Sequence, residues 1–98
     1  MAIARVFHSW GIGPATEESR KRSEEYNAKC RQAEGCEGLV NMADPAIGEG
    51  LSISRWRDQA AAQAFNATSE QMRSEGTRSN PGFKTVGPHV YTEVTALL

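Results

Sequence analysis

The chain has no long apolar run and no segment that resembles a targeting signal. None of its apolar stretches approaches the ~18 residues that a membrane-spanning helix needs. Residues 1–5 lack the basic start and apolar core of a secretory signal. We therefore expect no membrane partner, and the sequence predicts a soluble, cytoplasmic protein.

The chain also lacks an excess of charge of either sign. The net charge is −1, from 11 basic and 12 acidic residues. The densest basic cluster, residues 20–22, is interleaved with glutamates on a predicted helix, where pairs four residues apart are typical of a solvated face. A nucleic-acid partner is therefore not expected, because proteins that bind nucleic acids carry a basic patch or stripe.

Cysteine is scarce, and no metal or nucleotide motif is present. Cys30 and Cys36 are six positions apart, a spacing typical of neither a redox pair nor a zinc site. We interpret both as reduced packing residues, with a disulfide as the minority alternative in a cytosolic chain. The two histidines have no carboxylate placed by motif to complete a metal site. We expect neither a metal nor any other cofactor.

The pattern along the chain predicts a single domain over residues 1–98. Thr16 and Asp58 are suitable N-caps for two helices, and Gly35 suits the position after the first helix. Residues 74–87 predict a loop, whose length suits either a lid over a pocket or a plain connector. The expected elements are a strand at 2–12, a helix at 16–33, strands at 38–43 and 50–58, a helix at 59–73 and a strand at 89–97.

This β-α-β-β-α-β order predicts an α+β fold of the ferredoxin-like, split β-α-β type. Right-handed crossovers place the first strand in the middle, beside the third and the fourth. A small sheet with helices on one face must also cover its other face, and a homodimer does so economically. The inner stripe predicted for the first helix lacks large aliphatic side chains, so it either packs close to the sheet or leaves a gap: Ser19, Ser23, Tyr26, Cys30 and Ala33.

Three segments resemble a known family. They are Gly-Cys-Glu-Gly-Leu at 35–39, Ser-Arg-Trp-Arg-Asp-Gln-Ala at 54–60 and Gly-Pro-His-Val-Tyr at 87–91. With them, nearly the whole chain is similar to the dimeric α+β barrel superfamily, and within it to the antibiotic biosynthesis monooxygenase family. The resemblance implies a homodimer whose two sheets pack face to face, with a ligand pocket between the sheet and the helices of each subunit.

The resemblance also implies a class of function. Several members oxidise aromatic polyketides with molecular oxygen and no cofactor, whereas others degrade heme or only bind ligands. We expect a cofactor-independent monooxygenase for a small aromatic, polyketide-like or quinol-type substrate; the alternative is a non-catalytic, small-ligand-binding dimer of the stress-response type. The heme branch fits less well, because its histidine on the second helix corresponds here to Asn66.

Cofactor-free oxygenation needs a base, a group that stabilises an anion and a dry pocket. His8 is the candidate base, since a histidine titrates near neutrality. Aromatic residues would form a wall against a planar substrate, and a cation or a phenol would bind its phenolate oxygen. The candidates for substrate binding are Trp10, Arg55, Trp56, Phe65 and Tyr91.

Each candidate also has a structural interpretation. His8 is alternatively hydrogen-bonded within the dimer core, and Trp56 is a packing residue whatever else it does. Trp10 suits a dimer interface, where aromatic residues are enriched, and Tyr91 would bond there to the neighbouring subunit. The arginines on the strands would pair with carboxylates rather than with substrate: Arg5, Arg55 and Arg57 with Glu93 or Asp58.

Overall fold

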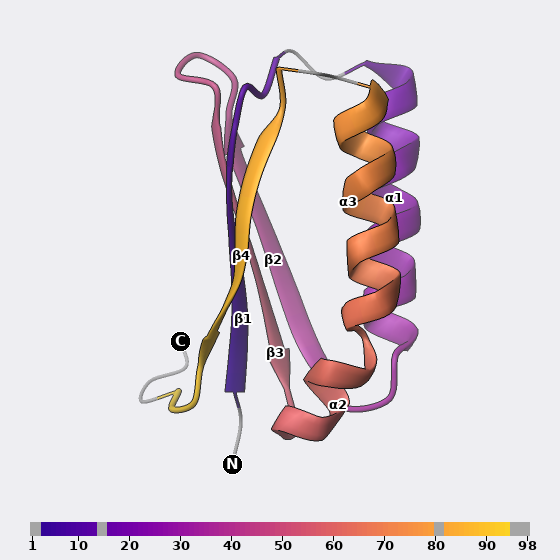
Figure 1. The fold of residues 1–98 in the computed structure, drawn as a ribbon, viewed down its shortest axis with the longest axis vertical. Coiled ribbons are helices and arrows are strands. Elements are labelled where there is room, and N and C mark those ends of the chain that lie inside the picture. Colours follow the sequence, from indigo (N-terminus) through magenta and orange to yellow (C-terminus); the bar gives the residue numbers. More distant parts are fainter. Residues whose placement is uncertain (1–2, 14–15, 80–81, 95–98) are drawn as a thin grey trace.

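The computed structural model describes residues 3–13, 16–79 and 82–94 of the chain. In this part of the chain, four antiparallel strands form one sheet, and all the helices lie on one of its faces (Figure 1). The elements, in order, are β1 (Ile3–Trp10), α1 (Glu17–Gln32), β2 (Cys36–Asp44), β3 (Glu49–Trp56), α2 (Gln59–Ala64), α3 (Asn66–Ser79) and β4 (Lys84–Tyr91).

The strand order is β2-β3-β1-β4, so β1 lies between β3 and β4 as the split β-α-β plan predicts. The hairpin predicted between the second and third strands is confirmed, although both strands are longer at the turn than expected. The fold class predicted from the sequence, α+β and ferredoxin-like, is confirmed.

Helix α1 begins where its capping residue predicts. The Thr16 hydroxyl accepts a hydrogen bond from the Ser19 amide at 3.0 Å, and the Ser19 hydroxyl accepts one from the Thr16 amide at 2.9 Å. This reciprocal box satisfies amides that the first helical turn leaves open. Ser23, predicted for the inner stripe, is instead exposed, while Tyr26 is partly buried and Cys30 fully buried.

The second predicted helix is in fact two helices. Asp58 caps α2, because its carboxylate accepts a hydrogen bond from the Ala61 amide at 2.8 Å. The helix then ends at Ala64 with Phe65 as its C-cap, and α3 starts at Asn66. Phe65 is buried at this joint, between the helices and the sheet.

The predicted loop at 74–87 is wrong. Helix α3 continues to Ser79, and β4 begins at Lys84. Small polar residues and Gly76 suggested a loop, but helix propensity is a weak guide where a helix packs against the rest of the fold. The final strand was also placed too late, since β4 ends at Tyr91 and residues 95–98 lie outside the described residues.

Pro88 explains why the start of β4 was hard to predict. A proline cannot donate to a strand ladder, which favours placing the strand after it. In the described sheet β4 is an edge strand that pairs with β1 alone, so the missing donor is tolerated.

The register assigns the strand residues to two faces. Arg5 pairs with Ser54 and with Val90, on the face that the helices cover. His8 pairs with Leu51 and with Val86, on the opposite face, which we call the open face. The main core lies under the helices and consists of Ile3, Cys30, Trp56, Ala61, Ala62 and Phe65.

Gly35 allows α2 to approach the start of β2. It has φ +84°. Ala33 caps the end of α1, so Gly35 is the second residue after the cap, whereas the sequence predicts it as the first. Its carbonyl accepts a hydrogen bond from the Arg57 amide at 2.7 Å. A side chain at this position would overlap the methyl group of Ala61.

We therefore expect Gly35→Ala to lower the free energy of unfolding by about 2 kcal/mol, from the left-handed backbone and the overlap together. Gly76 is the matched control, because it lies within α3 with no atom near the added methyl group. Gly76→Ala should raise the free energy of unfolding by about 0.5–1 kcal/mol. Urea unfolding followed by circular dichroism measures both, and equal stability of the two variants would contradict the packing described.

Candidate functional site

The space between the sheet and the helices holds a buried arginine among aromatic rings. Arg5 lies at the middle of the sheet, on β1, and is only 1% exposed. The distances from its Cζ to the ring centroids are 5.4 Å for Phe7, 5.9 Å for Trp56 and 5.8 Å for Phe65. These distances are within the range of cation–π attraction. We call Arg5, Phe7, Tyr26, Trp56 and Phe65 the inner cluster.

Arg5 is incompletely satisfied. Its Nε and Nη1 atoms are buried, and neither has a hydrogen-bond partner among the described residues. Burial is the main cause of a lowered pKa for Arg5, which the repulsion of Arg73 lowers further. A guanidinium nevertheless keeps its charge in a protein. The sequence predicted a carboxylate partner for Arg5; this is wrong, since none contacts it in the described part of the chain.

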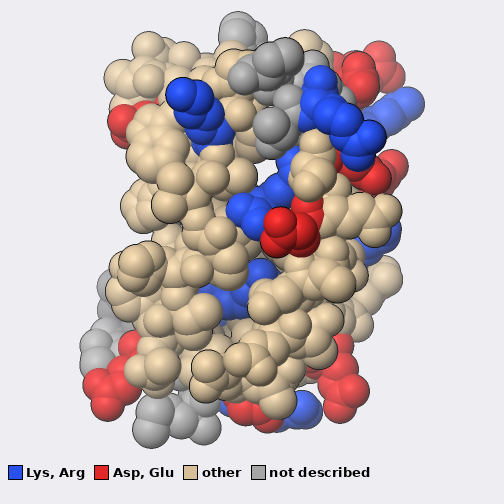
Figure 2. All heavy atoms as spheres, viewed as in Figure 1, with Lys and Arg blue, Asp and Glu red and all other residues tan. Residues whose placement is uncertain are grey.

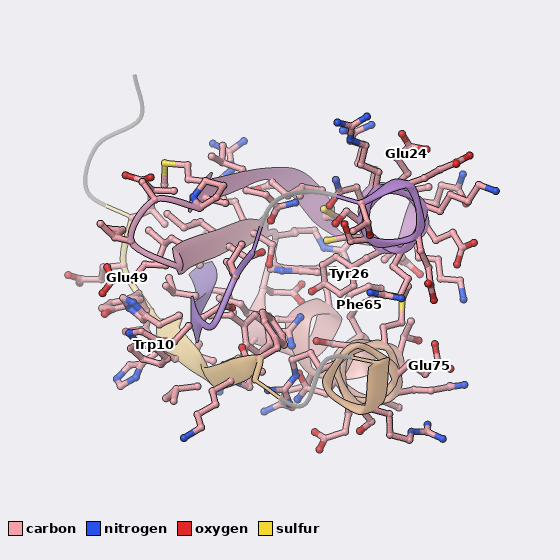
Figure 3. All side chains as sticks on the ribbon, turned by 90° about the horizontal axis from the view of Figure 1, so that it is seen from above. Trp10, Glu24, Tyr26, Glu49, Phe65 and Glu75 are labelled. Carbon is pink, nitrogen blue, oxygen red and sulfur yellow. The ribbon has the colours of Figure 1, made fainter. Side chains whose placement is uncertain are left out.

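Tyr26 and Ser69 add hydroxyl groups to the same space. The Tyr26 ring meets the Phe65 ring edge-on, with 6.0 Å between centroids, and the two lie between the helices and the sheet in Figure 3. Burial raises the pKa of Tyr26, and the neighbouring Ser69 hydroxyl offsets part of this shift. Ser69 is 1% exposed, and its Oγ makes no hydrogen bond of good geometry with any described residue. Tyr26 is therefore a neutral donor at neutral pH.

Trp56 forms the sheet side of the inner cluster. It is completely buried, its Nε1 donates to Ser54 Oγ at 2.8 Å, and its ring lies 5.3 Å from that of Phe65. The indole donor is satisfied locally, so the ring offers an apolar face rather than a polar contact.

The six residues predicted for the site lie on opposite faces of the sheet. Trp56 and Phe65 belong to the inner cluster. The other four have side chains on the open face: His8, Trp10, Arg55 and Tyr91. Figure 3 shows Trp10 on the side of the sheet away from Tyr26 and Phe65. One pocket between sheet and helices therefore does not bring all six together.

The open-face residues form contacts of their own. His8 stacks on Trp10 with 6.3 Å between centroids, and His89 lies 5.6 Å from Tyr91. Arg55 pairs with Glu37 at 3.3 Å, a carboxylate other than those expected. Arg57 pairs with Asp58 as predicted, and also with Glu34.

Sequence reasoning missed Arg5, Tyr26 and Ser69 as candidate site residues. The sequence does carry a signal for Arg5. It shares one face of its strand with Ile3 and Phe7, and that strand is predicted to lie in the middle of the sheet. Ser69 and Tyr26 come from two different helices, and their meeting depends on how those helices pack. Nothing in the spacing of the sequence encodes that meeting.

The two cysteines lie beside the inner cluster as free thiols. Their sulfur atoms are 3.9 Å apart, with Cys30 fully buried and Cys36 partly exposed. Burial and the adjacent Cys36 raise the pKa of Cys30 to about 12. Cys30 is therefore a protonated packing residue at neutral pH.

The described residues offer neither a metal-binding group nor a helix that could span a membrane. The described residues contain no group of three histidine, cysteine, aspartate or glutamate side chains that could hold a metal ion. Within the same residues, every helix is too short or too polar to span a bilayer.

The comparisons with known proteins fit this architecture. A variant of SnoaB, a cofactor-independent oxygenase from Streptomyces nogalater, matches with a TM-score of 0.70 and 12% identity, over 97% of this chain and 96% of the other. The chain has the fold of that oxygenase. No protein-family model matches the sequence, and no curated protein matches it.

Two other solved structures have a similar fold. The monooxygenase ActVA-Orf6 of Streptomyces coelicolor, in complex with Nanaomycin D, has a TM-score of 0.64 and 21% identity over 99% of this chain and 91% of the other. A candidate antibiotic biosynthesis monooxygenase from Deinococcus radiodurans has a TM-score of 0.66 and 19% identity over 100% and 97%. At these identities the likeness establishes the fold, and the predicted resemblance to this group of structures is confirmed.

The raised pKa of Cys30 gives a testable prediction. With iodoacetamide at pH 8, we expect the native protein to react at Cys36, whereas Cys30 reacts only after unfolding, because the thiolate is the nucleophile. Mass spectrometry of the peptides measures both rates, and Cys36→Ser serves as the control that retains Cys30 alone. Equal native rates at the two cysteines would contradict the burial described.

Proposed function

We propose that the protein is a cofactor-independent monooxygenase for a small aromatic, quinol-type substrate. The observation that carries the proposal is the inner cluster, which places aromatic faces around one buried cation in the fold of named oxygenases. Such a space suits a planar substrate that becomes an anion during the reaction.

The reaction follows from the chemistry of such substrates. A ring CH₂ flanked by phenolic rings loses a proton and gives a carbanion, which reduces O₂ and forms a C–O bond to a peroxide. Protonation and loss of water then leave C=O, so one O₂ gives one carbonyl and one H₂O. The four electrons come from the substrate itself. A fixed positive charge lowers the energy of the anion, and the aromatic walls exclude water.

The candidate base and the inner cluster lie on opposite faces of the sheet. His8 stays a prediction, because its ring lies on the open face and it reaches only a substrate bound there. Arg55, Trp10 and Tyr91 share that face and would contact the same substrate. The inner cluster and the open face are thus two locations for the chemistry, and a His8 variant distinguishes them.

One observation favours a second function, the binding of a small apolar or aromatic ligand without catalysis. The buried polar or charged residues in the described part of the chain are Arg5, Ser54 and Ser69, none of which is a base at neutral pH. Tyr26 and Cys30, the acids beside them, have raised pKa values and stay protonated. A pocket without a base binds a ligand but does not remove its proton. Oxygen-dependent turnover separates the two functions.

The oxygenase function predicts turnover of an anthrone, whose central CH₂ becomes C=O. We expect the enzyme to raise oxygen uptake above the rate of autoxidation, with one O₂ consumed for each quinone formed. This uptake should persist after metals are chelated. An oxygen electrode and quinone absorbance measure it. Tight binding of the anthrone without uptake would support the binding function instead.

The role of His8 is tested in the same assay. His8→Ala decides between the two locations: a rate lowered by about 10²-fold or more, the size of a general-base contribution, would place the chemistry on the open face. Full oxygen uptake by this variant would show that His8 is not the base.

We also propose that the open face is the interface of a homodimer. Its apolar side chains include Val40 at 55% exposed, Met42 at 50% and Trp10 at 41%. Large apolar side chains exposed together on one sheet face are unusual on a monomer, and they suit a second copy of the same sheet. The dimer would cover His8 and Trp10 and would leave the helices outside.

We expect the wild-type chain to have twice the mass of one chain in light scattering after size exclusion. Val40→Asp should shift the equilibrium to monomer, because a carboxylate would be buried without a partner. Ala67→Asp, on the exposed side of α3, is the matched control and should remain dimeric. A monomeric wild-type protein would contradict the proposed interface.

A further inference from the structure

Arg5 lies between the sheet and the helices, where no carboxylate of the described residues pairs with it. We propose that it anchors an anion subsite, holding a carboxylate or phenolate oxygen of an aromatic ligand whose ring lies against the inner cluster. This deepens the proposed function and rests on it for the identity of this space as the ligand pocket. It defines the ligand class as an aromatic anion.

Two nitrogen atoms of Arg5 lack a hydrogen-bond acceptor among the described residues. The rings of Phe7, Trp56 and Phe65 contact Arg5 at 5.4–5.9 Å and provide cation–π attraction. They provide no acceptor for the N–H groups at Nε and Nη1, which find none elsewhere in the described residues. Buried polar groups in native proteins are nearly always hydrogen-bonded. An anionic oxygen is the acceptor that a guanidinium binds most strongly.

The charges around Arg5 also favour an anion. The groups that act on Arg5 are Tyr26 and Cys30, both neutral at pH 7, and a second cation, Arg73. Arg73 comes from α3, and its Cζ lies 4.7 Å from the centroid of Phe7. Two guanidinium groups therefore flank the same ring. Glu70 pairs with Arg73 at 3.2 Å and is itself largely exposed. A ligand of negative charge would offset the repulsion between Arg5 and Arg73.

Two surface features bear on how a ligand would reach Arg5. Figure 2 shows an opening between the sheet and the helices, with blue basic atoms at its edge. A depression on the helix side is lined by Lys29, Gln32, Ala33, Phe65 and Thr68. Phe65 is among the residues that line this depression, and its ring also contacts Arg5.

The ring component of the ligand follows from the surroundings. An inorganic anion would meet Arg5 but would leave the aromatic faces unused. A planar arene carrying one ionised oxygen uses both, and the neutral hydroxyls of Tyr26 and Ser69 are further donors to that oxygen.

The test is isothermal titration calorimetry of the intact protein with three probes: 2-naphthoate, the neutral 2-naphthalenemethanol and inorganic phosphate. We expect naphthoate to bind at least about tenfold more tightly than the alcohol, as an added charged hydrogen bond implies. Phosphate should bind more weakly than naphthoate. Equal binding of naphthoate and the alcohol, tighter binding of phosphate, or no binding of naphthoate would overturn the proposal. These outcomes need no variant.

Arg5→Met locates the subsite, because it keeps the length of the side chain and removes the charge. We expect its affinity for naphthoate to fall about tenfold or more while its affinity for the alcohol is unchanged. Arg20→Met, on the exposed surface of α1, is the control and should bind as the wild type does. Circular dichroism checks folding, and replacement of a buried charge by an apolar group of similar size is commonly tolerated. Unchanged naphthoate binding by Arg5→Met, or a loss of binding in Arg55→Met instead, would overturn the assignment.

Failure of this inference is distinct from failure of the proposed function. Naphthoate binding that depends on Arg5, together with no oxygen uptake on anthrone, would retain the anion subsite and remove the oxygenase. Anthrone turnover that Arg5→Met leaves unchanged would retain the oxygenase and remove the subsite.

Discussion

The burial of one guanidinium under the helices is the constraint on which the rest of the site depends. Removing a charge from water costs several kcal/mol unless other groups replace the solvent. In this fold the replacement for Arg5 is incomplete: three ring faces contact it, but two of its nitrogens have no acceptor in the described residues. A stable fold bears such a cost only when the rest of the core is sound. Here the close contacts among Trp56, Phe65 and the small residues of α2 provide that support.

The two faces of the sheet carry different kinds of side chain. The face under the helices has an aromatic and cationic lining, with its acids held neutral by burial. The open face carries histidines, exposed apolar side chains and an ion pair at Arg55. Because residues two apart on β1 share a face, His8 and Arg5 belong to different environments although they are close in sequence. A mechanism that uses both needs a contribution from each side of the sheet.

The sequence was sufficient for the fold and partly sufficient for the site. Period-two alternation, the caps at Thr16 and Asp58 and the order of elements predict the sheet and its strand order, because these signals are local. The end of α3 and the start of β4 were misplaced, since Gly76 and Pro88 are tolerated for reasons of packing and of edge position that local signals do not contain. The faces of His8 and Trp56 depended on register, which the sequence left open. Arg5 was missed because an arginine on a strand usually finds a carboxylate, and only the packed structure shows that no described carboxylate pairs with this one.

The break between α2 and α3 limits the depth of the space proposed for the ligand. Phe65 caps one helix, forms part of the aromatic lining and is among the residues that line a surface depression. Insertion or deletion of one residue near this joint would rotate a different side chain inward by about 100°. The proposed ligand space would then change in size, while the strands and their pairing stay the same.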